Sequence, residues 1–144
     1  MTAGFGAPGH HGALDQPVGH INEGCCAQPI AIGVTDNPVV LGPAGRIHMS
    51  LQDLLRFLVT HRDRTTFLNS QTWMTLHNPA FGGDYALGWF VRSDGELWHN
   101  GSNDFWYVEA LVNSTAGIAA AAVSNDGRMS PAVGRTLLEA AAAA

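Results

Sequence analysis

One short run of the chain combines residue types that can move a proton and lie against a substrate: Leu97-Trp98-His99-Asn100-Gly101-Ser102. The imidazole of a histidine such as His99 changes charge near neutral pH and can donate or accept a hydrogen bond. A glycine such as Gly101 lets a ligand approach the edge of a strand closely. Taken alone, the run is more typical of an ordinary strand end and turn than of a site.

The chain contains no lysine, so a Ser-x-x-Lys motif, in which lysine activates a serine nucleophile, is impossible within it. Acyl transfer through serine requires a nucleophile, a base and donors for the oxyanion. No nucleophile–base pair is visible in the sequence. The chain is therefore predicted to supply only part of an active site, without the attacking group. All basic residues are arginines: Arg46, Arg56, Arg62, Arg64, Arg92, Arg128 and Arg135.

The composition is that of a globular domain, with 46% hydrophobic and 13% charged residues in a chain of 144. The net charge of −5 argues against a nucleic-acid or anionic membrane partner, because no basic patch could neutralise phosphates. No apolar run is long enough to span a bilayer. The first residues lack the basic and apolar regions of a signal peptide, and the compartment stays open.

Other chemically suggestive residues have simpler interpretations. The adjacent Cys25 and Cys26 are predicted to be reduced thiols in a loop, since a bridge between neighbours is strained. Ser50, Ser70 and Ser130 are better interpreted as helix caps than as nucleophiles. A metal site could be formed by a group of residues in the glycine-rich N-terminal region, but solvated side chains are expected there, and we predict no metal or cofactor. That group is His10, His11, Asp15, His20 and Glu23.

The elements that would position the run begin, in the sequence, after a long loop. Residues 1–45 are dense in glycine and proline and predict a loop-rich segment with one extended piece at 30–34, lying across another structural unit. Leucines at helical spacing predict a helix over 51–61, capped by Ser50. A second, short helix is predicted from a cap at Ser70 to Leu76.

Residues 85–124 predict an antiparallel sheet of about four strands. Strands at 85–92 and 96–100 would form a hairpin, followed by strands at 106–113 and 118–124. Ser130-Pro131 then predicts the start of a last helix, whose apolar stripe would be Val133, Leu137, Leu138 and Ala141. The fold class is therefore α+β, with residues 1–144 forming a single unit in which the C-terminal helix packs on the sheet.

Several segments, in order, resemble the class C β-lactamase-like serine hydrolases. They are Pro43–Ser50 with Asp53-Leu54-Leu55-Arg56-Phe57, the "YGLGW"-like Tyr85–Trp89, the "HxG-S"-like Trp98–Ser102, and Val123-Ser124-Asn125. The resemblance covers the C-terminal part of a family that includes β-lactamases, D-alanyl-D-alanine carboxypeptidases, esterases and amide hydrolases. It implies a partial β-lactamase-like fold, in which a helical domain and an antiparallel sheet flank the site. The family's Ser-x-x-Lys and Tyr-x-Asn motifs are both absent.

The resemblance also implies roles for the His-x-Gly-Ser run. The backbone N–H of Ser102 corresponds to one of two oxyanion donors, and His99 takes the place of a lysine that holds the substrate carboxylate or tunes a tyrosine. Asn100 and Gly101 are substrate-binding candidates, although Asn100 follows His99 in a strand and would point to the other face. The bulky Asp104-Phe105-Trp106 departs from the family pattern, and the alternative role of Phe105 and Trp106 is core packing.

Two functions follow as expectations. The first is a C-terminal fragment of a serine hydrolase that is inactive alone and partners the missing N-terminal half or a second copy of itself. Its final strand, 118–124, would then present an open apolar edge. The second is a non-catalytic binding or dimerisation module derived from such a hydrolase. Neither the substrate nor the oligomeric state follows from the sequence.

Overall fold

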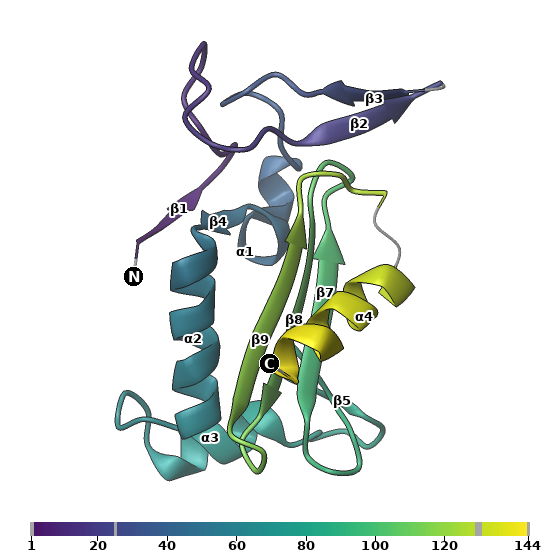
Figure 1. The fold of residues 1–144 in the computed structure, drawn as a ribbon. Helices are drawn as coiled ribbons and strands as arrows, with labels where there is room; N and C mark the ends of the chain where they lie inside the picture. The colour runs from purple at the N-terminus through teal and green to yellow at the C-terminus, as the bar shows by residue number, and fades with distance from the viewer. Residues whose placement is uncertain (1, 25, 129–130, 144) are drawn as a thin grey trace.

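The computed structural model describes residues 2–24, 26–128 and 131–143 (Figure 1). Its main element is a five-stranded antiparallel sheet in the order β5-β6-β7-β8-β9. The strands are β5 (Tyr85–Ala86), β6 (Trp89–Val91), β7 (Leu97–Ser102), β8 (Tyr107–Asn113) and β9 (Ile118–Ser124). The α+β class predicted from the sequence is confirmed, and the sheet has one strand more than predicted.

Two helices cover opposite faces of this sheet. Helix α2 (Leu51–Asp63) and helix α4 (Pro131–Ala142) both contact β8 and β9, and Figure 1 shows the strands between them. Side chains alternate between the two faces of a strand. Ala110 and Val112 of β8 accordingly pack toward α2, and Leu111 packs toward α4. The sequence predicted the helix on the α4 side and did not foresee that α2 covers the other face.

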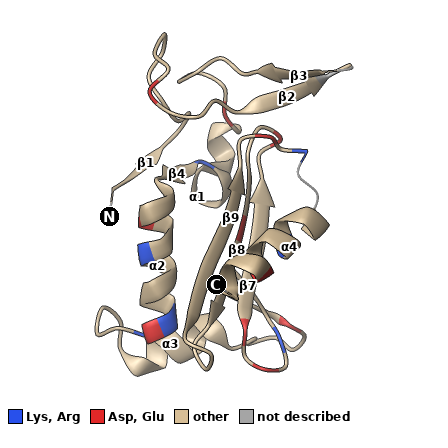
Figure 2. Ribbon diagram, in the orientation of Figure 1, with Lys and Arg blue, Asp and Glu red and all other residues tan. Residues whose placement is uncertain are grey.

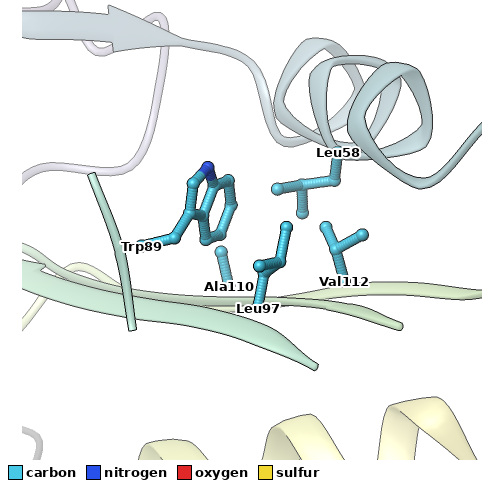
Figure 3. Close-up of a cluster of buried hydrophobic side chains, with 5 residues drawn as sticks. All are labelled: Leu58, Trp89, Leu97, Ala110 and Val112. Atoms are coloured by element: carbon cyan, nitrogen blue, oxygen red, sulfur yellow. The ribbon is translucent and has the colours of Figure 1, made fainter. Parts of the chain in front are cut away.

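The core beneath α2 is a compact apolar cluster, drawn in Figure 3. Leu58 of α2 is fully buried among side chains from three strands, with α4 on the far side of the sheet. Fully burying a leucine stabilises a fold by about 1.5–3 kcal/mol. This cluster is therefore the main link between α2 and the strands. Its buried members are Leu58, Trp89, Leu97, Ala110 and Val112.

The N-terminal 49 residues form short strands as well as turns. β1 (Ala3–Phe5) pairs with β4 (Ile47–Met49), and β2 (His20–Glu23) pairs with β3 (Cys26–Pro29) in a hairpin. The 3-10 helix η1 (Val39–Leu41) and the single-turn α1 (Gly42–Gly45) complete the region. The extended piece predicted at 30–34 is wrong, because the strand of the hairpin ends at Pro29 and turns follow it.

The β2–β3 hairpin and the segment before it lie across one end of the sheet (Figure 1), as predicted for this region. Asn125 donates its side-chain amide to the Val18 carbonyl oxygen at 2.8 Å, and His20 Nδ1 lies 3.0 Å from the Asn125 carbonyl oxygen. The chain start is fixed to α2 by Thr2, whose N–H and hydroxyl both donate to Asp53. These bonds, with an ion pair to Arg56, lower the pKa of Asp53 strongly.

Helix α2 begins as predicted. Ser50 accepts a hydrogen bond from the Asp53 N–H, and the helix continues two residues beyond the predicted end, to Asp63. The prediction that Ser70 caps α3 (Ser70–His77) is wrong. The cap is Asn69, whose side chain accepts from the Thr72 N–H, and Ser70 is already inside the helix. Asparagine places its side-chain oxygen as serine does at this position.

Two other predictions also need correction. The strand predicted at 85–92 is two short strands, β5 and β6, joined at Leu87-Gly88, where Gly88 has a φ of +90°. On α4 the buried positions are Gly134 and Leu138, while Val133 and Leu137 are half exposed. Ser130, predicted to cap this helix, lies outside the described residues, as does Cys25. Cys26 lies exposed in β3 rather than in a loop.

Candidate active-site strand

The end of β7 forms an open strand edge. β6 pairs with β7 only through Phe90 opposite Trp98 and Val91 opposite Leu97. The following residues, His99–Ser102, pair with β8 on one side and, within the described residues, with no strand on the other. Gly101 and Ser102 are exposed. Backbone donors and acceptors on such an edge are available to a ligand that binds as a further strand or against it.

His99 lies at this edge within a group of aromatic rings. Its Nε2 is 3.0 Å from the hydroxyl of Tyr85 on β5. Its ring stacks on Phe90 of β6, with centroids 5.7 Å apart and planes inclined by 28°. The neighbouring hairpin therefore holds the imidazole from two directions, by a hydrogen bond and by a ring face. A half-buried histidine held in this way can donate to or accept from a group bound along the edge.

Asn100 takes part in a different environment. In register His99 lies opposite Ala110 of the cluster beneath α2, whereas Asn100 lies opposite Glu109. The Asn100 amide donates to the Tyr107 hydroxyl at 3.0 Å, and that hydroxyl donates to Glu109 at 3.1 Å. The structure therefore does not bring Asn100 together with His99, and the Asn100 amide is bonded to Tyr107 within the fold.

The chain Asn100–Tyr107–Glu109 lies beneath α4 at Gly134. A Cβ atom added to Gly134 would meet the Glu109 carboxylate at 2.5 Å and the Tyr107 ring at 2.8 Å. Glu109 is only 2% exposed, and the Tyr107 hydroxyl is its hydrogen-bond donor. Burial raises the pKa of Tyr107, which therefore stays a neutral donor over the ordinary pH range. These contacts connect β7, β8 and α4 directly behind the candidate edge.

The hydroxyl of Ser102 is engaged in the turn that follows β7. It accepts from the Asp104 N–H at 3.0 Å and donates to the Trp106 carbonyl oxygen at 2.8 Å. Asp104 has a φ of +70°, and the Asn103 side chain accepts from the backbone N–H groups of Phe105 and Trp106. The hydroxyl is therefore a structural group, and the backbone N–H of Ser102 is the part of this residue that fits a role in the site.

Phe105 and Trp106 connect the turn to the N-terminal segment. The Phe105 carbonyl oxygen accepts from the His20 N–H at 3.2 Å. The Trp106 indole lies against Gly19 so closely that a Cβ there would meet Nε1 at 2.6 Å, and Ile30 packs beside it. The Trp106 side chain thus packs against the N-terminal segment, in agreement with the packing role given as the alternative in the sequence analysis. This contact fixes the turn at the end of β7.

A buried histidine pair, which the sequence analysis missed, lies between α2 and α3. His61 Nδ1 and His77 Nε2 are 2.8 Å apart, and the rings contact Trp73 and Trp89. Burial lowers the pKa of both imidazoles. The pKa of His77 falls to about 4, because charge repulsion from His61 and Arg64 adds to the effect of burial at that residue. Leu54, Leu58 and His61 share a helical stripe, which is the signal that could have predicted the burial of His61.

The described residues contain no group of three or more histidine, cysteine, aspartate or glutamate side chains that could hold a metal ion. His10 contacts Asp15 in the N-terminal region, and that contact lowers the pKa of Asp15. None of the helices in the part of the chain described here has the length and apolarity that a membrane crossing requires. Figure 2 shows the charged residues at scattered positions along the ribbon, with arginines and acidic residues interspersed.

The described residues thus combine an antiparallel sheet between two helices with a His-x-Gly-Ser strand end at an open edge of that sheet. A model of the Beta-lactamase family matches residues 3–144. The chain therefore belongs to the Beta-lactamase family, as the resemblance of its motifs indicated. A comparison with curated proteins finds no match.

Proposed function

We propose that the chain supplies one wall of the active site of a serine hydrolase that works through an acyl-enzyme, of the β-lactamase, D-alanyl-D-alanine carboxypeptidase or esterase type. β7 flanks the substrate, His99 and Gly101 contact it, and the backbone N–H of Ser102 is one of two oxyanion donors. Donors placed where negative charge develops are commonly the largest single contribution to such catalysis. Asn100 is left out of the proposal because its amide donates to Tyr107.

The observation that carries the proposal is the free edge of β7 from His99 to Ser102, in a chain of the Beta-lactamase family. An edge with exposed backbone at Gly101 and Ser102 lets an amide or ester carbonyl lie against the strand. A Cβ at Gly101 would have no neighbour closer than Val108 at 4.0 Å, so packing inside the fold does not require glycine there. An absent side chain leaves room on the side where a substrate would lie.

The nucleophile and its base come from residues outside this chain, and the chain alone is inactive. The absence of lysine rules out Ser-x-x-Lys within it, and neither tyrosine is followed by the asparagine of Tyr-x-Asn. A wall that binds the carbonyl without supplying the attacking group cannot form an acyl-enzyme. The partner is therefore the N-terminal half of a hydrolase of this family.

The unpaired edge of β9 is a second observation that favours such a partner. Within the described residues β9 pairs only with β8, so its other edge has no strand beside it. Ile118–Ser124 contains no charge and no proline, which are the common means of protecting an edge strand from pairing. A strand from the partner would complete the sheet there.

The first test is intact mass spectrometry of the purified chain after exposure to a fluorophosphonate and, separately, to benzylpenicillin. We expect no covalent adduct with either reagent, while a complete serine hydrolase treated in parallel is labelled. A stoichiometric adduct on the 144-residue chain would show that a working nucleophile lies within it, and the proposed division of the site would be wrong.

The second test measures binding without turnover. The amide signals of Gly101 and Ser102 in a ¹⁵N-labelled chain should shift as benzylpenicillin is added. Gly101→Val fills the open side of the strand and should remove the shifts, whereas Ser102→Ala retains the backbone N–H and should preserve them. Shifts that persist in Gly101→Val, or that occur only at residues remote from β7, would contradict the role of the edge.

A second candidate is a non-catalytic dimerisation module, and the open edge of β9 is the observation that favours it. Two copies could pair β9 with β9 and form one continuous sheet. Light scattering coupled to size exclusion distinguishes the two functions. A stable dimer that binds no penicillin supports the module, and a monomer whose β7 amides respond to penicillin supports the hydrolase wall.

A further inference from the structure

We infer that Tyr85 is a positioning residue for His99: its hydroxyl donates to Nε2 and thereby selects the tautomer in which Nδ1 carries the proton. Nδ1–H then becomes the donor that His99 offers along the β7 edge to an acceptor oxygen of the substrate, a carbonyl or a carboxylate. The donation of Nδ1–H to a substrate rests on the proposed function. The tautomer of His99 is a property of the free chain and does not.

The geometry around His99 leaves one nitrogen engaged and one available. Tyr85 Oη lies 3.0 Å from Nε2, and the two rings meet edge to face with centroids 5.9 Å apart. Phe90 lies against both rings, stacking on His99 at 5.7 Å and meeting Tyr85 edge-on at 4.8 Å. Among the described residues Nδ1 has no hydrogen-bond partner. A ligand at the edge would meet this nitrogen without displacing an existing bond.

The direction of the hydrogen bond follows from the chemistry of the two groups. A phenol O–H is a stronger acid than a neutral imidazole N–H, and an unprotonated imidazole nitrogen is a better acceptor than a phenol oxygen. The favoured pair is therefore Tyr85 O–H donating to Nε2. Because a neutral imidazole carries only one N–H, the proton must then be on Nδ1. In water, free imidazole side chains prefer the opposite tautomer, so Tyr85 would reverse the intrinsic preference.

The hairpin explains how Tyr85 comes to this place. Tyr85 lies opposite Phe90, and the turn between β5 and β6 is only Leu87-Gly88. The φ of +90° at Gly88 lies in the region that favours glycine, so this turn depends on the residue. Had residues 85–92 formed one continuous strand, Tyr85 would lie far from His99. The hairpin is therefore the element that brings a tyrosine from β5 to the imidazole on β7.

Long-range ¹H–¹⁵N spectra of the histidine rings test the tautomer directly in the free chain at about pH 8, where free imidazole is neutral. The His99 signals are identified by their loss in His99→Gln. We expect Nε2 to resonate as an unprotonated nitrogen and Nδ1 as a protonated one. In Tyr85→Phe, which keeps the ring and removes the hydroxyl, the two assignments should exchange. Phe90→Leu removes the stacked ring and should leave the tautomer unchanged.

A wild-type His99 with its proton on Nε2, or a tautomer that is unchanged in Tyr85→Phe, would overturn the inference. The amide spectrum of each variant shows that the sheet is intact, and the buried His61 and His77 serve as internal references. The readout requires neither a partner nor turnover. Failure of penicillin to shift the β7 amides would therefore contradict the proposed function while leaving the tautomer result standing, and the reverse holds as well.

Discussion

The buried pair His61–His77 should make the stability of the protein fall as the solution becomes mildly acidic. His77 is 3% exposed, its Nε2 is bonded to His61, and its Nδ1 is buried without a hydrogen-bond partner among the described residues. A proton added to this imidazole would place a charge among aromatic rings. Burial therefore lowers its pKa from 6.5 to about 4.

The magnitude follows from linkage between protonation and folding. The unfolded chain takes up a proton on His77 near pH 6.5, whereas the folded chain resists until about pH 4. Stability is therefore full above pH 6.5 and is lost as pH falls between these two values. At about 1.36 kcal/mol per pKa unit, the shift corresponds to about 3 kcal/mol. The pKa of His61 is lowered by burial too, so its contribution has the same sign.

Urea unfolding at a series of pH values between about 7.5 and 4 measures this loss. Trp73 and Trp89 lie beside the pair, so tryptophan fluorescence reports its environment. The midpoint should decrease as pH falls while the denaturant slope stays constant. His77→Gln replaces the imidazole by an amide that can still bond to His61 and does not titrate, and its unfolding free energy should vary much less over the same interval.

The matched control is His11→Gln, which removes an exposed histidine from the N-terminal loop and should leave the pH dependence as in the wild type. A wild-type unfolding free energy that is constant from pH 7 to 4.5 would refute the reasoning. So would a dependence that persists undiminished in His77→Gln, because the proton uptake would then belong to other groups.

Three further changes test other contacts. Gly134→Ala, which at an ordinary helix position would be stabilising, should cost about 1–3 kcal/mol in thermal or urea unfolding, since the new methyl group meets Glu109; a gain in stability would contradict the close packing. Asn69→Ala should lower the free energy of unfolding by about 1 kcal/mol, whereas Ser70→Ala should change it little. Equal losses in urea unfolding of the two variants would contradict the assignment of Asn69 as the cap. Val123→Lys places a charge on the β9 edge, and light scattering should show less self-association at high concentration than in the wild type.

The elements that could be predicted from the sequence are those whose signals are local. The leucine spacing and the Ser50 cap of α2 predict the helix, and alternating residues predict β8. The alanine run of β9 also has helix propensity, and it is the shortness of the run and the turn signals on both sides that favour a strand. The caps of α3 could not be separated in this way, since Asn69 and Ser70 are both good capping residues. On α4 Leu137 and Leu138 are adjacent, and only the position of Gly134 against Tyr107 determines which leucine is buried.

The parts that could not be predicted depend on distant partners. β1 pairs with β4 across more than forty residues, and no local sequence pattern predicts such a pairing. His99 could be singled out as a candidate from its run of neighbours. Its bond to Tyr85 could not, because it depends on a two-residue turn inside what the sequence pattern indicates is one strand. The separation of Asn100 from His99 did follow from strand periodicity alone.

The segment that crosses the end of the sheet also affects the order in which the chain can fold during synthesis. Val18 and His20 are translated more than a hundred residues before Asn125, and both bond to it. Their native contacts cannot form until Asn125 has been translated, and closing so long a loop is slow. Until then the leading segment has only local pairing, such as the β2–β3 hairpin. A ribosome stalled before residue 125 would therefore display the segment around Val18 and His20 in a form that proteases can reach, and translation beyond Asn125 would allow the contacts that protect it.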